Sequence, residues 1–273
     1  MTDTSSPRLA VHGISAGYAG RTVIDGLDLS FAPGRMTAII GANACGKSTL
    51  LSTLARVLTP TAGHVSLDGD DVASLPRRRF ARQVGLLPQQ PTAPDGLTVA
   101  ELVSRGRHPH RGVFQRWSTA DSASVDAAMT TTGVAALADR PVGDLSGGQR
   151  QRVWIAMALA QEPRILLLDE PTTFLDLSHQ IEVLDLLREL NHTSGTTIIA
   201  VLHELNLAAR YADELIVMKG GRALAQGTPT DVLTRDVVAE AFALDALVTP
   251  DPLTQTPLVI PVPGGAHAPR DRG

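Results

Sequence analysis

The chain has 273 residues, of which 43% are hydrophobic and 19% are charged, and its formal net charge at pH 7 is -4. This length and apolar fraction allow one large α/β domain or two small ones and exclude wholesale disorder, while the interspersed charges do not indicate a basic surface for nucleic acid. The single cysteine, Cys45, excludes an intramolecular disulfide, and the lack of a signal peptide or of any apolar run near the ~20 residues that span a bilayer predicts a cytoplasmic protein.

The first third of the chain alternates strand-like and helix-like patterns. Residues 9–18 and 22–34 alternate apolar and polar side chains, which predicts antiparallel strands. Residues 35–41 read as a short buried strand, and residues 48–58 as a helix with leucines at positions 50, 51, 54 and 58 near one face. Further strands are predicted at residues 64–69 and 84–89, the second stopped by Pro88 and Pro91.

The rest of the chain changes character twice. Residues 98–162 are rich in alanine and predict a helical insertion that ends in a helix starting after Ser146, a good N-cap residue. Residues 164–170 and 196–203 are continuous apolar runs typical of parallel strands covered on both faces, and residues 178–191 form an amphipathic helix between them. A hairpin with its turn at Gly220-Gly221 follows. Buried strands that alternate with helices predict an α/β fold with a mainly parallel sheet.

A phosphate-binding loop is the strongest chemical motif. Residues 41–48 match G-x-x-x-x-G-K-[ST] between a predicted strand and a predicted helix. Gly41 and Gly46 let backbone N–H groups turn toward phosphates, and the helix N-terminus adds partial positive charge. Lys47 reaches the β- and γ-phosphates, and the Ser48 hydroxyl can ligate Mg²⁺. Cys45 is interpreted as a small loop residue rather than as a redox or metal site.

Two acids follow a buried strand. Asp169 and Glu170 stand at its carboxyl end, where ligands meet open α/β sheets. Alone, the pair would also suit a surface cap of the next segment. Together with the phosphate loop, it predicts that Asp169 holds the Mg²⁺ shell with Ser48 and that Glu170 polarises the attacking water.

The segment Leu145-Ser146-Gly147-Gly148-Gln149 narrows the family, because the chain here resembles the ABC ATPases, whose signature is LSGGQ. A serine cap and two glycines at a helix start leave backbone N–H groups free for an anion. The resemblance implies a P-loop NTPase fold with a mostly parallel RecA-like core sheet, an antiparallel β subdomain and an α-helical subdomain. It also implies a head-to-tail homodimer in which the signature of one subunit closes on the γ-phosphate bound by the other.

Further positions resemble family motifs one at a time. Gln89, with Gln90 as the neighbouring candidate, resembles the Q-loop glutamine that senses Mg²⁺, and Asp176 resembles the D-loop aspartate, a role compatible with capping the next helix. His203 resembles the switch histidine, and Tyr18 the aromatic residue that stacks on adenine. Many family members have proline where this chain has Ala42, a departure that leaves the glycines, Lys47 and Ser48 in place. The residues predicted to bind ATP are Tyr18, Gly41, Asn43, Ala44, Cys45, Gly46, Lys47, Ser48, Thr49, Gln89, Leu145, Ser146, Gly147, Gly148, Gln149 and Asp176; those predicted to be catalytic are Glu170, His203 and Lys47, and those predicted to bind the metal are Ser48, Gln89 and Asp169.

The resemblance covers residues 8–262 as one nucleotide-binding domain, with a helical subdomain at about 98–162 and a disordered tail at 263–273. Whole segments look like the ATPases of ferric-siderophore importers, with haem or cobalamin importers and exporters as alternatives. This implies ATP hydrolysis coupled to uptake, at the cytoplasmic face of the membrane, with transmembrane permease subunits and an extracytoplasmic substrate-binding protein. The basic stretch around His108 and His110 is interpreted as a loop facing solvent or a membrane partner, not as a metal site.

Overall fold

An antiparallel sheet is formed by the first strands of the chain. The computed structural model describes residues 8–112 and 116–263. β1 (Leu9–Tyr18) pairs antiparallel with β2 (Arg21–Phe31) on one side and with β4 (Ala62–Leu67) on the other, and the short β5 (Asp70–Asp71) lies at the edge. Ile14, Ile24 and Phe31 are fully buried, because alternate residues of each strand face the core. The alternating pattern of the sequence therefore predicted these strands correctly.

The central sheet has six strands in the order β10-β9-β3-β8-β7-β6. All the pairs from β9 to β6 are parallel, and only β10 joins antiparallel, through the hairpin turn at Gly220-Gly221. Every residue of β3, β7 and β8 is buried, as expected for parallel strands covered on both faces. The strands are β3 (Met36–Gly41), β6 (Val84–Leu87), β7 (Ile165–Asp169), β8 (Thr197–Val201), β9 (Glu214–Lys219) and β10 (Arg222–Gly227).

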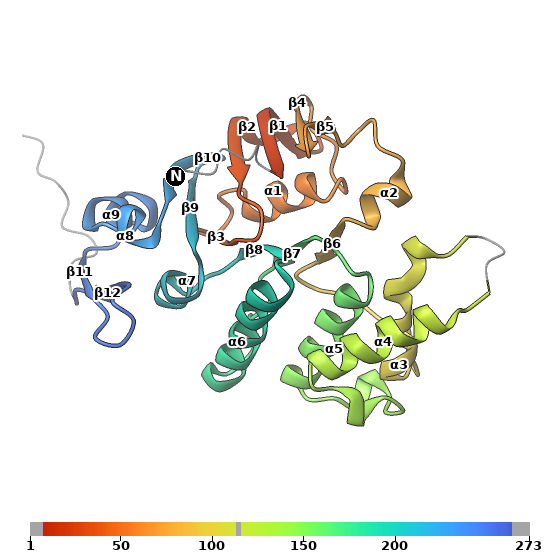
Figure 1. Cartoon of the computed structure of the whole chain (residues 1–273). Helices are drawn as coiled ribbons and strands as arrows, with labels where there is room; N and C mark the ends of the chain where they lie inside the picture. Colours follow the sequence, from red (N-terminus) through yellow and green to blue (C-terminus); the bar gives the residue numbers. More distant parts are fainter. Residues whose placement is uncertain (1–7, 113–115, 264–273) are drawn as a thin grey trace, which may run out of the picture.

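Two hydrophobic cores lie on the two faces of this sheet. Along β7, Ile165 and Leu167 point into the core shared with α1 (Lys47–Leu54) and the antiparallel sheet, while Leu166 and Leu168 point into the core shared with α6 (Leu177–Ser194) and α7 (Leu205–Tyr211). The figure shows α1 between the two sheets, with α6 and α7 on the other side (Figure 1). The predicted mostly parallel α/β architecture is confirmed.

The first helix is shorter than the sequence pattern predicted. α1 ends at Leu54, although the leucine spacing extended to residue 58. Arg56 has a left-handed backbone conformation (φ 58°), and its guanidinium donates to the carbonyls of Ala73 and Leu75. These contacts outside the helix accompany a turn that leaves the helical path, so Leu58 packs as part of a loop.

A group of helices extends from the β6 edge of the sheet (Figure 1). α3, α4 and α5 contact one another, and each begins at a residue whose side chain forms a reciprocal capping box: Thr98, Ser118 and Ser146. The elements here are α3 (Val99–Ser104), the 3₁₀ helix η1 (Arg105–His110), α4 (Thr119–Thr131), the 3₁₀ turns η2 (Ala135–Leu137) and η3 (Val142–Asp144), and α5 (Gly147–Ala160); α2 (Arg77–Ala81) precedes β6.

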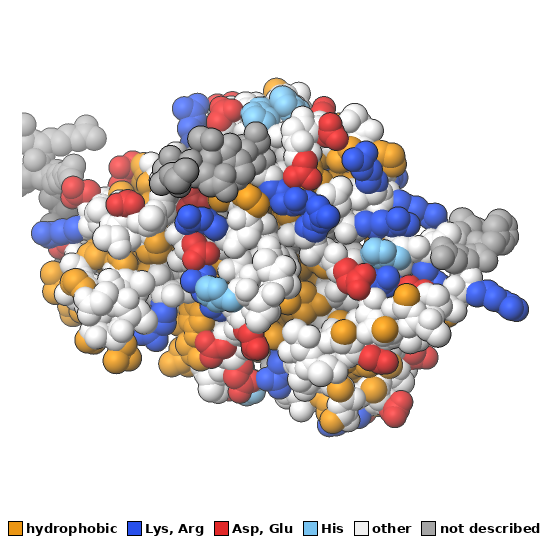
Figure 2. Space-filling model, viewed as in Figure 1, with side chains coloured by type: hydrophobic (Ala, Val, Ile, Leu, Met, Phe, Trp, Pro, Cys, Tyr) orange, Lys and Arg blue, Asp and Glu red, His pale blue; other side chains and the backbone are white. Residues whose placement is uncertain are grey.

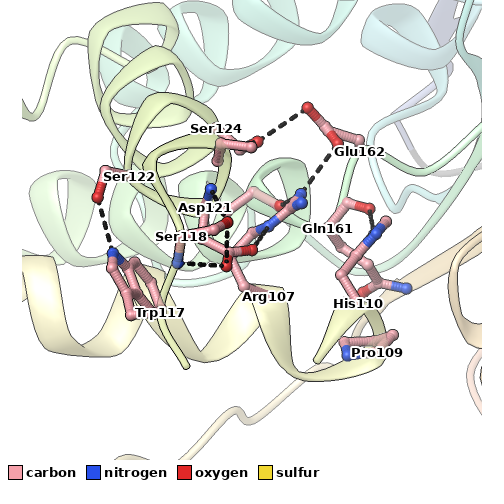
Figure 3. Close-up of polar contacts among 12 residues, drawn as sticks. Arg107, Pro109, His110, Trp117, Ser118, Asp121, Ser122, Ser124, Gln161 and Glu162 are labelled. Carbon is pink, nitrogen blue, oxygen red and sulfur yellow. Dashed lines mark hydrogen bonds and ion pairs between the residues drawn. The ribbon is translucent and has the colours of Figure 1, made fainter. Parts of the chain in front are cut away.

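A buried arginine holds this group of helices together. Arg107 is 5% exposed, and its guanidinium contacts Asp121 of α4 at 3.1 Å, the Ala160 carbonyl at 2.7 Å and Glu162 at 2.9 Å (Figure 3). His110 of the same segment donates to the Gln161 carbonyl. The stretch that the sequence predicts to be a loop is instead the 3₁₀ helix η1, in which His108 is exposed, in line with that prediction, while Arg107 is buried.

The C-terminal elements lie at the opposite end of the central sheet, beside β9 and β10 (Figure 1). They are α8 (Pro229–Val232), α9 (Arg235–Phe242) and the two-stranded sheet of β11 (Ala246–Pro250) and β12 (Pro257–Pro261). Apart from Pro263, the predicted disordered tail at 263–273 lies outside the described residues. On the face shown in Figure 2, basic and acidic side chains are interspersed. Among the described residues, no helix is both long enough and apolar enough to cross a bilayer.

Candidate nucleotide-binding site

The loop between β3 and α1 has the geometry of a phosphate cradle. Gly46, the N-cap of α1, has φ 110°, and Gly41 has φ 152°, conformations that favour glycine. A Cβ at Gly41 would stand 2.3 Å from the Met218 carbonyl oxygen, so the close packing of β3 against β9 also requires glycine there. Lys47 is 5% exposed, and its ammonium donates to the Gly41 and Ala42 carbonyls at 2.8 and 3.0 Å.

The start of α1 leaves backbone donors available to a ligand. Gly46 offers no side-chain cap, and the first turn of the helix contains no acidic residue. The first N–H groups of a helix lack intrahelical acceptors and carry partial positive charge, so an anion satisfies both needs. Gly41, Cys45 and Gly46 thus shape a loop whose donors suit phosphate oxygens. The neighbouring Lys47 ammonium depresses the pKa of the Cys45 thiol, but desolvation dominates and raises that pKa overall.

Two oxygen ligands suited to a hard cation meet beside the loop. The Ser48 hydroxyl donates to an Asp169 carboxylate oxygen at 3.0 Å, at the carboxyl end of β7. Burial raises the pKa of Asp169, and the neighbouring Glu170 charge acts in the same direction, against the hydrogen bond from Ser48. No group of three or more His, Cys, Asp or Glu side chains that could hold a metal occurs among the described residues. A hydroxyl and one carboxylate fit Mg²⁺, which keeps water and phosphate oxygens as its other ligands.

Glu170 is held by three side chains from different parts of the chain. Its carboxylate oxygens contact His203 Nε2 at 2.6 Å, Gln89 Nε2 at 2.6 Å and the Thr173 hydroxyl at 3.1 Å. Burial opposes ionisation of this carboxyl, yet the hydrogen bonds from His203, Gln89 and Thr173 outweigh it and lower the pKa of Glu170. Glu170 also has a left-handed backbone (φ 53°), which is costly for this residue type. The carboxylate is therefore ionised and fixed at neutral pH.

Most of the predicted site residues of the loop, the strand ends and the first hairpin line one pocket of about 830 Å³, whereas Gly41 and the predicted metal ligand Asp169 are not part of its lining. Tyr18, at the end of β1, is 53% exposed at one side of this pocket, and Gln89, Glu170 and His203 are on its wall. The side chain that contacts Glu170 is Gln89, which favours it over Gln90. Sequence reasoning missed several members of the lining: Arg21, Thr22, Val23, Gly220 and Gly221.

The β9–β10 turn is joined directly to the phosphate loop. The Gly221 N–H donates to the Cys45 carbonyl at 3.0 Å, and a Cβ at Gly221 would stand 2.1 Å from the Val23 carbonyl oxygen. The glycine pair was predicted as a hairpin turn, and its contact with the loop has no local signal in the sequence. Thr173, three residues after Glu170 and hydrogen-bonded to it, was also missed.

The signature segment lies apart from this pocket. Ser146 caps α5: its hydroxyl accepts the Gln149 N–H at 3.3 Å, and the Gln149 side chain accepts the Ser146 N–H at 3.2 Å. This reciprocal cap leaves the N–H groups of Gly147 and Gly148 without a side-chain partner from within the cap. None of residues 145–149 lines the pocket that contains Lys47. Their predicted nucleotide contacts therefore require a second surface.

Asp176 also lies outside the pocket lining, at the start of α6. Its carboxylate accepts the His179 N–H at 3.0 Å and the Ser178 hydroxyl at 2.8 Å. The backbone hydrogen bond from His179 leads these contacts in lowering the pKa of Asp176 to about 2. The predicted capping function is thus present, and the predicted role across a dimer stays a prediction. Two exposed apolar side chains flank it: Phe174, 89% exposed with φ 66°, and Leu177, 67% exposed.

Comparison with known proteins agrees with this geometry. The achromobactin transport ATP-binding protein CbrD of Dickeya dadantii is 52% identical over 95% of this chain and 96% of its own length. The ferric enterobactin transport ATP-binding protein FepC of Escherichia coli is 50% identical over 96% of both chains. The solved structure of a metal-chelate-type ABC transporter in an inward-facing conformation matches with a TM-score of 0.82 at 27% identity, covering 94% of this chain and 98% of that chain.

A family model is matched by residues 24–173, the span from β2 to Thr173 that contains the phosphate loop, the signature and the acidic strand end. This stretch is more than half of the chain, and the relatives match nearly all of it. The resemblance seen in the signature motif is confirmed: the chain belongs to the ABC transporter family.

Proposed function

We propose that this chain is the ATP-binding and ATP-hydrolysing subunit of an ABC importer that takes up a ferric siderophore. The relatives named for achromobactin and ferric enterobactin transport support the cargo class, since each aligns over nearly its full length. We propose residues 8–262 as one nucleotide-binding domain, with the helical subdomain at 98–162. The permease subunits and the extracytoplasmic binding protein handle the siderophore, and this subunit works at the cytoplasmic face of the membrane.

One observation carries the proposed mechanism: the pocket around Lys47 contains no residue of the signature segment, although both carry donors for phosphate. A single subunit thus offers two half-sites that do not meet. Two copies arranged head to tail would bring the signature of one to the γ-phosphate held by the other. Phe174 and Leu177, on either side of Asp176 in the sequence, are exposed and thus available for such a contact.

Within one half-site, each residue has a distinct task. Lys47 and the amides of the loop bind the β- and γ-phosphates, and Tyr18 stacks on adenine. Ser48, Asp169 and Gln89 would hold Mg²⁺, which, when bound, supplies charge neutralisation to the transferring phosphoryl group. Glu170, kept ionised by its partners, orients and polarises the attacking water, and His203 lies within reach of the same region. Catalysis is then positioning and electrostatic stabilisation with little covalent chemistry by the protein.

The test of the mechanism is Glu170→Gln. The amide keeps the shape but removes the charge that polarises water, so turnover should fall by a factor of about 10²–10⁴ while ATP still binds. Steady-state phosphate release and equilibrium binding of a fluorescent ATP analogue measure the two properties separately. Turnover within a few-fold of the parent protein would overturn the role of Glu170. Uptake of ⁵⁵Fe-loaded siderophores by a deletion strain tests the cargo, and unchanged uptake of each siderophore would overturn that part.

A further inference from the structure

The ring of His179, in the first turn of α6, lies directly against the start of α5. A Cβ added to Gly148 would stand 2.4 Å from His179 Cδ2, 3.0 Å from Cγ and 3.2 Å from Nε2. The direction of that missing Cβ is therefore occupied by the imidazole. Gly148 is buried beneath this contact, in a helix turn that otherwise faces outward. A side chain at position 148 would therefore force the His179 ring to move.

The same ring is fixed from its other side. His179 Nδ1 donates to Asp176 Oδ1 at 2.7 Å, and the backbone N–H of His179 donates to the same oxygen at 3.0 Å. The Asp176 carboxylate is ionised throughout the neutral range, with its pKa lowered to about 2. One imidazole thus connects a carboxylate at the start of α6 with Gly148 at the start of α5.

Two more contacts support the joint between the two helices. Arg152, further along α5, contacts Glu182, one turn further along α6, at 2.5 Å. At the end nearer to Asp176, a Cβ on Gly147 would lie 3.6 Å from the side chain of Leu175, an ordinary packing distance. The beginnings of α5 and α6 are therefore held as a pair, with His179 as the tightest contact.

We propose that His179 is a positioning residue that sets where the signature amides point. Because the ring contacts both Asp176 and Gly148, the position of the segment carrying Asp176 determines where the start of α5 lies. The signature segment thus keeps a fixed position within the subunit. The proposal rests on the proposed function, in which the signature of one subunit binds the nucleotide of the other. His179 itself contacts no nucleotide: it does not line the pocket around Lys47. Loss of the ring weakens dimer closure and leaves binding to the subunit's own loop intact.

The experiment uses the full-length chain with Glu170→Gln, so that ATP binds without turnover. Analytical ultracentrifugation with ATP measures the dimer dissociation constant, and a fluorescent ATP analogue at low protein concentration measures binding to the monomer. His179→Ala should raise the dimer dissociation constant about tenfold, the scale expected for a displaced site residue, without changing monomer binding. His192→Ala is the matched control, because His192 is exposed in the last turn of the same helix. Its two constants should equal those of the parent protein.

Two further substitutions separate the contacts of the ring. His179→Phe keeps a ring against Gly148 but loses the bond to Asp176, and His179→Asn keeps a donor for Asp176 but loses the ring. If both variants have a higher dimer dissociation constant than the parent protein, each contact of the ring is needed. A dimer dissociation constant of His179→Ala equal to that of the parent protein overturns the proposal. Because the side chain of His179 is 37% exposed, these variants should fold, and thermal melting checks this.

A double-mutant cycle tests the contact itself. Gly148→Ala should weaken dimerisation when His179 is present, because the new methyl group meets the ring. In the His179→Ala background the same change should cost clearly less, because only the need for an open amide remains, and the cycle should be non-additive. An equal loss in both backgrounds would show that Gly148 is needed for another reason and would overturn the inference. A Glu170→Gln protein that stays monomeric with ATP would instead refute the head-to-tail site of the proposed function, and this inference with it.

Discussion

Replacement of Arg107 by methionine should destabilise the protein more than loss of any exposed ion pair. Methionine has a similar reach but no charge, so the change leaves the Asp121 carboxylate, whose side chain is 6% exposed, without its cationic partner. The Ala160 carbonyl loses a donor at the same time. Breaking one side of a buried ion pair costs about 3–5 kcal/mol, because an uncompensated charge stays in a medium of low polarity.

The matched control is Arg152→Met. The Arg152–Glu182 pair also joins two helices, but its side chains are 26% and 49% exposed, so solvent screens it and the loss should be about 1 kcal/mol or less. For a chain of this size, 1 kcal/mol corresponds to about 2–4 °C in melting temperature, so Arg107→Met should lower it by about 6–20 °C. Urea unfolding followed by circular dichroism gives both free energies directly.

A double variant tests the cause of the loss. Asp121→Asn removes the buried charge but keeps a side chain that can bond to Ser118, so adding it to Arg107→Met should recover part of the stability. The reasoning is wrong if Arg107→Met costs no more than Arg152→Met, or if the second substitution makes the first one worse. Either result would mean that the packing of the arginine stem, not the ion pair shown in Figure 3, holds η1 against α4.

Three further predictions concern pH, the adenine end and the loop. The hydroxyl of Ser118 and then the guanidinium of Arg107 lower the pKa of Asp121 from 3.8 to about 2. The contribution of Asp121 to stability is therefore complete above about pH 4 and is lost as the pH falls toward 2. The unfolding free energy of Asp121→Asn should fall less steeply across that range than that of the parent protein, and an identical slope would exclude Asp121 as a source of acid lability. Tyr18→Ala should weaken binding of a fluorescent ATP analogue by the ~1–3 kcal/mol typical of base stacking, whereas Tyr18→Trp should not; equal affinity of all three proteins would remove Tyr18 from the site. Gly41→Ala places a methyl group 2.3 Å from the Met218 carbonyl oxygen, so urea titration should show a loss of stability even without nucleotide, and an unchanged midpoint would mean that β3 and β9 can separate at this point.

Local patterns were enough for the parts of the fold that are set by neighbours in the chain. The buried runs of β3, β7 and β8, the Ser146 cap and the hairpin turn at Gly220-Gly221 were all read from short stretches. The phosphate loop belongs to the same class, because its geometry depends on glycines at fixed spacing between a strand and a helix. The predicted fold followed from these elements and from the rule that buried strands alternating with helices form a parallel sheet.

The remaining features depend on contacts between distant segments. The burial of Arg107 could not be predicted from its own segment, because arginine is rarely buried. The three acceptors of its guanidinium, at Asp121, Ala160 and Glu162, come from two later segments of the chain. The turn that follows the end of α1 at Leu54 is accompanied by hydrogen bonds from Arg56 to the Ala73 and Leu75 carbonyls, which lie about twenty residues further along the chain. No spacing within either segment contains this information.

The glycines show most clearly the difference between features that a local pattern predicts and features that depend on distant contacts. Gly41 and Gly46 have positive φ and also belong to a motif, so their pattern alone indicates both their conformation and their ligand. Gly148 belongs to a motif as well, and the motif suggests only that its amide must stay open to an anion. The structure adds an internal constraint, the His179 ring where a Cβ would be. A motif position can therefore serve binding and packing at once, and only substitution of the second residue in the contact separates the two demands.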